Sequence, residues 1–497
     1  MTEEIIIDNI DETWIKLTAN QGILQELSEL LTFDVEGAAF MPSFRKKYWD
    51  GKIRLLKGDK LYKGLLKFVE KFCKERDYSF KTKIKQSDFD IKFYDDFISS
   101  LKLRDEKGNV LEARDYQLEA IKKGITNNRK VFLSPTASGK SYIIAALIKF
   151  YKEEIPGKIL LLVPNISLVE QMYSDFKEYF AGDKSFIVEE EVGKIYSGQE
   201  RLDRKLTIST WQSLYDLPKN NFHDFDMVIA DEVHLFKSKE ISKLLEKLYN
   251  AKYRFGFTGT LDNVQCHELT LTGLFGPISR MTTTSKLINE NKLSKLKVNC
   301  LVMGYSEQEK KAAQHFTWED EVQFLISHQE RTKFIAKLAT SLKGNSLVLF
   351  SRVETHGELI FDEISKLTDR PVYYIHGGTN PKDREETRSL VETHDTSIIV
   401  ASSQIFAQGI NIKSLANIIF SHPSKSRIRV LQSIGRVLRL SEKKSESTLY
   451  DIADDLRHNG KVNFSLRHFE ERVKIYASEE FPYAIKSFQL RKTYQPS

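Results

Sequence analysis

The stretch Lys130–Phe150, KVFLSPTASGKSYIIAALIKF, joins a short apolar run to a helix-forming run through a loop of small residues. The apolar part, Val131–Leu133, has the length of a buried strand, and Ser141–Glu154 has the length of a helix. A strand that leads through a tight loop into a helix is the first half of a βαβ unit, in which the next strand lies parallel to the first. The stretch therefore predicts an α/β fold with a parallel, doubly wound sheet.

The same alternation continues along the chain and then restarts after residue 330. Short apolar runs rich in β-branched residues are separated by helix-like stretches in both series. We therefore expect two doubly wound domains in tandem, each with its own parallel sheet. The expected strands are Val131–Leu133, Lys158–Val163, Leu206–Ser209, Met227–Ala230 and Tyr253–Phe257 in the first domain, and Ser346–Phe350, Pro371–Ile375, Ser397–Ala401, Asn417–Phe420 and Thr448–Ile452 in the second.

Two smaller parts flank these domains. Residues 1–95 predict a small α+β domain, with strands at Ile5–Ile7 and Ile53–Leu56 and an amphipathic helix at Leu61–Arg76. The segment Phe464–Ser487 predicts one or two amphipathic helices. The expected domains are residues 1–95, 96–285, 286–455 and 456–497.

The composition excludes several classes of protein. With 41% hydrophobic and 29% charged residues, the 497-residue chain is neither disordered nor fibrous. No run approaches the roughly 18 apolar residues of a membrane span. The N-terminus, MTEEIIIDNIDET, has no secretory signal pattern, and three scattered cysteines fit neither a disulfide framework nor a zinc site. We expect a soluble, cytoplasmic protein without membrane contacts.

The loop after the first strand has the chemistry of a phosphate-binding loop. Small residues let the backbone curl so that its N–H groups, at a helix N-terminus, face phosphate oxygens. Lys140 would reach the β- and γ-phosphates of ATP, and the Ser141 hydroxyl would bind Mg²⁺. Ser134 stands where the first glycine of such a loop is usual. The residues expected to bind the nucleotide here are Pro135, Thr136, Ala137, Ser138, Gly139, Lys140 and Ser141.

A pair of acidic residues follows the apolar run Asp226–Ala230. A carboxylate at the end of such a strand lies beside the phosphate loop in doubly wound ATPases. Asp231 would hold Mg²⁺, and Glu232 would position and deprotonate the attacking water. The acidic pair therefore predicts ATP hydrolysis.

The second α/β domain supplies two arginines, Arg436 and Arg439, three positions apart on one helical face. Phosphoryl transfer is slow without a fixed cation on the γ-phosphate, and an arginine from another domain supplies one. We therefore expect an ATP site formed from both domains, which closes on ATP and opens after hydrolysis.

These segments stand in the order found in superfamily 2 helicases of the DExH type, and the chain resembles that family over residues 110–455. The acidic motif is Asp231-Glu-Val-His234, and the arginine motif begins at Gln432, where many relatives have histidine. The further matching segments are Arg114–Gln117 for adenine, Leu162–Gln171 and Ser209–Ser213 for motifs Ia and Ib, Thr258–Thr260 for motif III, Leu347–Val353 for motif IV and Ile398–Ile412 for motif V.

The resemblance implies two tandem RecA-like domains, preceded by the small α+β domain and followed by a C-terminal helical segment. It also implies ATP and Mg²⁺ as cofactors. Arg114, Gln117 and Gly409 would bind the nucleotide, and Gln432 would join the catalytic groups. His234, Thr258 and Thr260 would couple hydrolysis to movement.

Segments outside the motor core resemble the phage UvsW-type helicases. They are Phe40–Leu56 (FMPSFRKKYWDGKIRLL), Lys71–Cys73 and the tail segment ASEEFPYAIKSFQL. This resemblance implies a monomer that remodels branched or forked DNA by fork regression, Holliday junction branch migration and R-loop unwinding. Its setting would be phage recombination, repair and replication in the host cytoplasm, and RNA–DNA hybrids and proteins of those processes would be its other partners.

The family places motifs Ia, Ib, IV and V along one nucleic-acid strand. Their side chains here are mostly small and polar, which suits phosphate and sugar, so we expect binding without sequence preference. A basic and aromatic run, Arg45–Arg54, would hold duplex phosphate and stack on an opened base, and Asp50–Gly51 predicts a hairpin turn that projects it. The expected nucleic-acid contacts are Arg45, Lys46, Lys47, Trp49, Lys52, Arg54, Pro164, Asn165, Thr210, Ser351, Arg352, His376, Ser402 and Ser403.

Three other functions are compatible with the same motifs. The chain would serve as the motor of a restriction or other nuclease complex, as an ATP-gated clamp on nucleic acid, or as an RNA helicase. Intact Glu232, Arg436 and Arg439 argue against a clamp that only binds ATP. The sequence has no direct readout of the 2′-hydroxyl that separates RNA from DNA.

Overall fold

The computed structural model describes residues 4–35, 37–84, 92–196, 203–235, 239–262, 264–408, 412–422, 426–441, 444 and 446–490. Contacts divide the chain into two compact units: residues 1–134 with 139–281, and residues 135–138 with 282–497. The first unit holds the N-terminal domain and the first α/β domain, and the second unit holds the second α/β domain.

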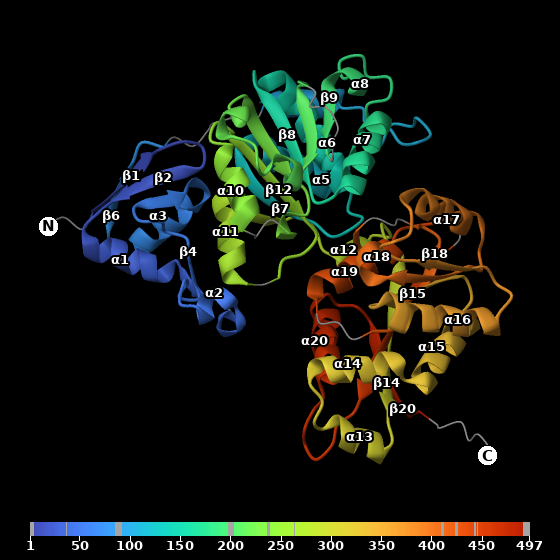
Figure 1. Ribbon diagram of the computed structural model, residues 1–497. Coiled ribbons are helices and arrows are strands. Elements are labelled where there is room, and N and C mark those ends of the chain that lie inside the picture. Colours follow the sequence, from blue (N-terminus) through green and yellow to red (C-terminus); the bar gives the residue numbers. More distant parts are fainter. Residues whose placement is uncertain are drawn as a thin grey trace, which may run out of the picture. The chain divides into compact units, whose positions relative to one another are not determined.

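The N-terminal domain is a small α+β domain, as predicted, and is drawn in blue in Figure 1. Its four-stranded sheet has the order β5-β2-β1-β6, and a separate pair, β3 and β4, is antiparallel. The core is mainly aliphatic, and it includes Ile5 and Ile7 of β1 and Ile15 and Leu17 of β2, which alternate with residues on the opposite face of the sheet. The elements are β1 (Glu4–Asn9), β2 (Trp14–Thr18), α1 (Gln21–Leu30), β3 (Thr32–Asp34), α2 (Pro42–Arg45), β4 (Lys52–Arg54), β5 (Lys60–Tyr62), α3 (Leu66–Glu75) and β6 (Ser79–Thr82).

Two local predictions for this domain are wrong. The helix expected from Leu61 begins only at Leu66, because Lys60–Tyr62 pairs with β2 as an edge strand. Asp50–Gly51 does not join two paired strands: β4 pairs with β3, which lies before α2 in the chain. The turn at Gly51, where φ is +79°, therefore leads out of the α2 segment into β4.

The first α/β domain has a seven-stranded parallel sheet with the strand order β13-β7-β12-β11-β8-β10-β9. All five predicted strands are present, and β9 and β13 are added at the two edges. The strands are β7 (Arg129–Leu133), β8 (Lys158–Val163), β9 (Val192–Ile195), β10 (Leu206–Thr210), β11 (Phe225–Ala230), β12 (Tyr253–Thr258) and β13 (Ile278–Arg280). The helices are α4 (Lys92–Ser100), α5 (Asp115–Thr126), α6 (Lys140–Glu154), α7 (Ile166–Tyr179), α8 (Val188–Glu191), α9 (Trp211–Leu214), α10 (Lys239–Lys247) and α11 (Gln265–Phe275).

The N-terminal domain packs closely on this sheet's helices. Tyr62 is 3% exposed and belongs to the hydrophobic core of the first α/β domain. Its ring stacks on Trp14 with centroids 4.3 Å apart, and its hydroxyl donates to Glu246 at 2.7 Å. Gly64 allows the approach, because a Cβ there would lie 2.1 Å from the carbonyl oxygen of Thr272. Each domain keeps its own core, and Tyr62 of the N-terminal domain is buried in the core of the first α/β domain.

A buried guanidinium strengthens the same contact. Arg254 is fully buried, and it donates to the carbonyls of Leu245, Leu248 and Ala251 and, at 2.7 Å, to the hydroxyl of Thr13. A buried charge is tolerated only when its donors are satisfied, so the N-terminal domain completes the arginine's hydrogen bonding.

The second α/β domain repeats the architecture with the strand order β16-β17-β15-β18-β19-β14-β20, again parallel. The predicted pair of tandem doubly wound domains is thereby confirmed. The strands are β14 (Lys295–Gly304), β15 (Asn345–Phe350), β16 (Val372–Ile375), β17 (Ile398–Ser402), β18 (Leu415–Phe420), β19 (Glu446–Asp455) and β20 (Tyr483–Gln489). The helices are α12 (Thr284–Asn289), α13 (Glu307–Ala313), α14 (Trp318–Ser327), α15 (Gln329–Ser341), α16 (Glu358–Leu367), α17 (Pro381–Thr393), α18 (Ser403–Gln408), α19 (Arg427–Val437) and α20 (Phe464–Ser478).

The C-terminal segment is helical only in its first part. The predicted helix is α20, but Tyr483–Gln489 forms β20 and pairs in parallel with β14. Most side chains of β20 are exposed, so the strand lacks the alternation that would have identified it. Among the described helices, none combines the length and apolarity needed to cross a membrane.

The burial of Tyr62 in the core of the first α/β domain leads to a prediction about stability. Tyr62→Ala should lower the free energy of unfolding by about 3–5 kcal/mol, because it leaves a cavity where a buried ring packed. Tyr48→Ala is the matched control: that ring is 84% exposed, so its loss should change stability by less than about 0.5 kcal/mol. Urea unfolding followed by tryptophan fluorescence measures both. Equal midpoints for the two variants would show that Tyr62 is not part of the core.

Candidate functional site

The phosphate loop begins where β7 ends, at the carboxyl edge of the first sheet. The backbone N–H of Ser134 donates to the carbonyl of Thr258 at 2.9 Å, which ties the start of the loop to the end of β12. Ala137 has φ of +65° and Gly139 has φ of +79°. These left-handed residues curl the loop, which is the geometry that turns successive N–H groups toward an anion.

Gln117 contacts this loop from α5. Its amide nitrogen donates to the carbonyl of Gly139 at 3.4 Å, and its oxygen accepts from the backbone N–H of Arg114 at 2.9 Å. A Cβ on Gly139 would lie 2.4 Å from that amide nitrogen. Arg114 caps α5 and donates to the hydroxyl of Tyr116. The structure thus brings the predicted adenine-binding segment to the phosphate loop.

The central contact of the site is between Lys140 and Glu232, whose Nζ and Oε1 lie 3.3 Å apart. Lys140 begins α6, and Glu232 follows β11 with φ of +50°, a conformation that is strained for a residue other than glycine. Asp231 precedes it with its N–H on the carbonyl of Leu162 at 2.9 Å. The parallel strands β7 and β11 therefore deliver both groups to the same edge of the sheet.

The two carboxylates have opposite pKa shifts. Burial and the negative charge of Glu232 raise the pKa of Asp231 to about 6. Burial also acts to raise the pKa of Glu232, but the charge of Lys140 and the contact with His234 outweigh it and lower that pKa below its usual value. Glu232 is therefore ionised at neutral pH, whereas Asp231 keeps its proton more readily until a cation approaches.

His234 links the acidic motif to motif III. Its Nδ1 lies 2.8 Å from the Thr258 hydroxyl, and that hydroxyl donates to the carbonyl of Thr260 at 3.0 Å. His234 is 4% exposed. Since Thr258 also receives the N–H of Ser134, one threonine connects the phosphate loop, the acidic motif and motif III.

Sequence reasoning missed Tyr179, the last residue of α7. Its hydroxyl lies 2.8 Å from the hydroxyl of Ser141, and burial raises its pKa to about 12, so it stays protonated. No local pattern marks this tyrosine, because only the packing of α7 on α6 brings it to the loop.

The arginine motif lies in the second unit. Gln432 and Arg436 lie on α19, and Arg439 follows the end of that helix. The Arg436 guanidinium lies 5.9 Å from the centroid of the Phe406 ring, and the carbonyl of Arg439 accepts from the Ser294 hydroxyl at 3.2 Å. Gly409, the expected nucleotide contact of motif V, lies outside the described residues.

The N-terminal basic run includes both paired and unpaired cations. Arg54 forms a two-point ion pair with Asp50, and Lys52 lies 3.8 Å from Asp34. Trp49 donates its indole N–H to the carbonyl of Lys52 at 2.8 Å, so its orientation is fixed. These contacts assign structural roles to part of the run.

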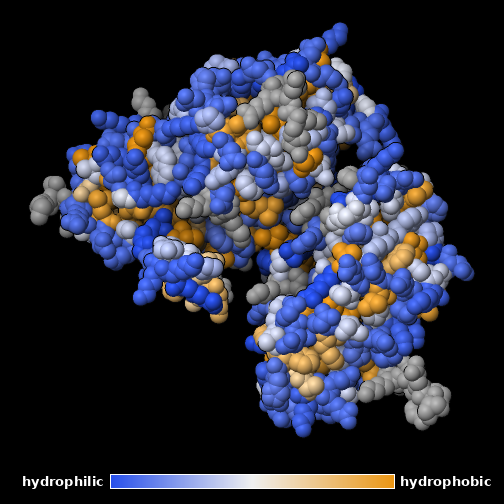
Figure 2. Space-filling view, viewed as in Figure 1, coloured by the Kyte–Doolittle hydropathy of each residue, from blue (hydrophilic) through white to orange (hydrophobic). Residues whose placement is uncertain are grey.

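Arg45, Lys46 and Lys47 have no carboxylate partner within the described part of the chain. Beside them Phe40 is 77% exposed and Tyr48 is 84% exposed. Figure 2 shows hydrophilic and hydrophobic surface side by side on the lobe that carries α2. This exposed set, Phe40 and Arg45–Tyr48, is named the α2 patch.

The predicted strand-tracking residues of the first α/β domain lie at the carboxyl ends of β8 and β10, which are paired neighbours. Pro164 follows β8, and Asn165 caps α7 by accepting from the N–H of Leu168 at 3.0 Å. The Thr210 hydroxyl shares a hydrogen bond of 2.9 Å with Ser213. The side chains of Asn165 and Thr210 therefore already make local hydrogen bonds.

The corresponding residues of the second domain follow β15, β16 and β17. Ser402 ends β17 opposite Phe350, and the Ser403 hydroxyl donates to the Phe350 carbonyl at 2.7 Å. Arg352 donates to Gln323 at 2.9 Å and forms an exposed ion pair with Glu319. The remaining two residues are Ser351, which donates its N–H to His356, and His376, which accepts from the N–H of Gly378.

Family models match three parts of the chain. They are "DNA helicase UvsW, N-terminal" at residues 4–83, "Type III restriction enzyme, res subunit" at residues 110–263, and "Helicase conserved C-terminal domain" at residues 330–441. The second and third models cover segments with helicase motifs, and the first covers the N-terminal segment that resembles the UvsW-type helicases.

Similar proteins extend this result to the whole chain. The ATP-dependent DNA helicase uvsW of Enterobacteria phage T4 is 33% identical over 97% of this chain and 98% of its own length. The crystal structure of T4 UvsW is 31% identical with a TM-score of 0.52, and the match covers 98% of this chain and 100% of that one. The DNA 3'-5' translocase XPB2 of Sulfurisphaera tokodaii is 23% identical over 69% of this chain and 81% of its own length. The chain belongs to the family of UvsW DNA helicases.

Proposed function

We propose that the chain is an ATP-dependent DNA helicase that remodels branched DNA by fork regression, Holliday junction branch migration and R-loop unwinding. The observation that carries the proposal is the contact between Lys140 and Glu232 in a domain whose core includes Tyr62 of a UvsW-type N-terminal domain. The first feature supplies ATP chemistry, and the second supplies a further surface for DNA next to the motor.

The residues around the phosphate loop suit Mg²⁺ and ATP. The Ser141 hydroxyl and the Asp231 carboxylate are oxygen donors of the kind that Mg²⁺ prefers, and a divalent cation would relieve the unfavourable charge that raises the pKa of Asp231. When bound, Mg²⁺ neutralises phosphate charge. The Tyr179 hydroxyl can accept a hydrogen bond from the Ser141 hydroxyl, which leaves the lone pairs of the serine oxygen available to the metal.

ATP would change the state of Glu232. In the structure Lys140 lies against this carboxylate and lowers its pKa. The β- and γ-phosphates would draw Lys140 away, and the loss of that positive charge raises the pKa of Glu232 and makes it a stronger base. Glu232 then takes a proton from the attacking water only when ATP is in place.

We propose that Arg436, on α19, and Arg439, just after the end of that helix, supply positive charge to the γ-phosphate during hydrolysis. Gln432 lies on the same helix as Arg436. His234 and Thr258 would pass the change at the acidic motif to motif III, because their hydrogen bond is buried and sensitive to the position of Glu232. The phosphate contacts of motifs Ia, Ib, IV and V would bind DNA without sequence preference.

A comparison of substrates tests this function. ATP turnover and strand separation are measured with matched forked DNA and forked RNA. We expect strand separation and stimulation of ATP turnover with forked DNA but not with forked RNA. Stimulated turnover without unwinding or fork regression would favour a clamp or the motor of a nuclease complex, and equal activity on RNA would favour an RNA helicase.

Lys140→Ala should lower ATP turnover by about two to three orders of magnitude, because the γ-phosphate loses its cation from the phosphate loop. The measurement is steady-state phosphate release, with thermal unfolding to show that the variant is folded. If the variant turned over ATP as fast as the unchanged protein, Lys140 would not be part of an ATP site.

Glu232→Gln should retain ATP binding but slow hydrolysis by about 10²–10⁴-fold, since the amide can hydrogen-bond but cannot take a proton. Binding of a fluorescent ATP analogue and single-turnover hydrolysis separate the two effects. Glu154→Gln, an exposed change at the other end of α6, is the control and should hydrolyse ATP normally. Normal hydrolysis by Glu232→Gln would place the general base elsewhere.

The α2 patch gives a prediction for DNA binding. Arg45, Lys46 and Lys47 changed together to Ala should make the slope of log affinity for forked DNA against log salt shallower by about 2–3 units. The control changes Lys16, Lys71 and Lys81, which are paired with Asp59, Glu75 and Glu4 in the same domain. A slope unchanged by the first triple, or changed equally by both, would show that the α2 patch does not contact phosphates.

A further inference from the structure

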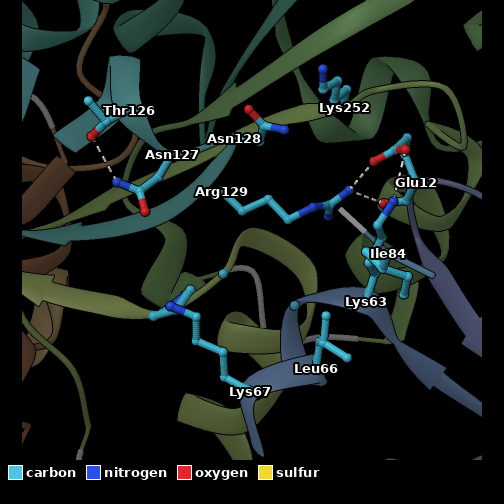
Figure 3. Close-up of a pocket in the computed structure, with 13 residues that line it drawn as sticks. Glu12, Lys63, Leu66, Lys67, Ile84, Thr126, Asn127, Asn128, Arg129 and Lys252 are labelled. Carbon is cyan, nitrogen blue, oxygen red and sulfur yellow. Dashed lines mark hydrogen bonds and ion pairs between the residues drawn. The ribbon is translucent and has the colours of Figure 1, made fainter. Parts of the chain in front are cut away.

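A pocket of about 250 Å³ lies where the N-terminal domain meets the first α/β domain. Figure 3 shows Lys63 and Lys67 entering it from the N-terminal domain, and Arg129 and Lys252 from the α/β domain. All of these residues belong to the first unit. No motif of the helicase core includes this pocket.

The pocket has an excess of positive charge. Four cations line it, but Glu12 is its only carboxylate in the described part of the chain. Glu12 is already shared, with Oε1 2.9 Å from Lys63 and Oε2 2.9 Å from Arg129. Lys67 and Lys252 are exposed and have no ion pair with any described residue. One carboxylate cannot neutralise four cations, so the pocket favours an anion.

Arg129, which lines the pocket, also has an N–H donor that forms no hydrogen bond with any described residue. Nη2 of Arg129 bonds to Glu12, whereas Nη1 is buried and has no hydrogen-bond partner among the described residues. A buried donor without a partner is uncommon and costs stability. The neighbouring Lys130 has its pKa lowered by burial and by the charges of Lys67 and Lys123, which shows the same local excess of positive charge.

An anion with several oxygens would satisfy these groups. The planar guanidinium of Arg129 provides directional donors, and the ammonium groups of Lys67 and Lys252 act as point charges, a combination that suits phosphate. For a DNA helicase the abundant phosphate is the phosphodiester backbone. We propose that this pocket binds a backbone phosphate of DNA at the joint between the N-terminal domain and the first α/β domain.

This inference rests on the proposed function and adds a contact outside the helicase motifs and the α2 patch. Because Tyr62 and Arg254 join the two domains, a phosphate held at their joint would be fixed relative to Lys140 and Glu232, which belong to the same unit. DNA outside the strand-tracking motifs would then move with the first α/β domain during each ATP cycle.

The test uses the full chain with Lys67→Ala and Lys252→Ala combined. Both side chains are exposed, so folding and DNA-independent ATP turnover should be unchanged. The slope of log affinity for forked DNA against log salt should become shallower by about 2 units, since two phosphate contacts are lost. The control combines Lys74→Ala, also on α3, with Lys219→Ala, a lysine that lies over a tyrosine ring as Lys252 does. It removes the same charge and should leave the slope unchanged.

The outcomes separate this inference from the proposed function. If the unchanged protein binds DNA with a steep salt slope and the Lys67/Lys252 variant has that same slope, the pocket is not a DNA site. If the unchanged protein itself does not bind DNA, the proposed function fails first. If inorganic phosphate raises the melting temperature of the unchanged protein but not of the variant, while the DNA slopes agree, the pocket binds free phosphate and the DNA assignment is overturned.

Discussion

The pairing of Lys140 with Glu232 is the interaction on which the rest of the first unit depends. A lysine that starts a helix and a glutamate that follows a strand lie 3.3 Å apart only because β7 and β11 run parallel in one sheet and end at the same edge. The same edge carries Asp231, Thr258 and the phosphate loop. The sheet therefore acts as the frame that holds charged groups together in a buried site, where their interaction is strong.

Buried polar links extend this frame in two directions. Toward motif III, Nδ1 of the buried His234 lies 2.8 Å from the Thr258 hydroxyl and 3.2 Å from the Glu232 carboxylate. Toward the N-terminal domain, Arg254 donates to the Thr13 hydroxyl, and Tyr62 is buried in the core of the first α/β domain.

The residues predicted to contact nucleic acid are organised differently. Several predicted residues, including Asn165, Thr210 and Arg352, already bond to neighbouring protein groups. The α2 patch and the pocket at Lys67 and Lys252 instead have cations that lack carboxylate partners among the described residues. Salt-dependent affinity should therefore come mainly from the N-terminal domain and its joint, and the motifs should contribute positioning.

The sequence by itself determined the chemistry and the architecture of the core. The phosphate loop, the acidic pair and the alternating strands and helices are local patterns, and each needs only the period of a strand or helix and the residue types of a turn. For that reason the tandem parallel sheets and the position of the acidic pair beside the phosphate loop could be predicted. Two strands could not be predicted: the exposed strand β20, and β5, which stands where the sequence predicted the start of a helix. Each pairs with a strand that is distant in the sequence, β14 for β20 and β2 for β5.

Only the tertiary structure decided which groups from distant segments meet. The Tyr179 hydroxyl on α7 bonds to Ser141 on α6, and Arg254 of the α/β domain bonds to Thr13 of the N-terminal domain. Lys67 and Lys252, from the same two domains, line one pocket. No sequence motif or regular spacing marks any of these pairs. They depend on burial and on the satisfaction of hydrogen bonds, which are properties of the assembled core.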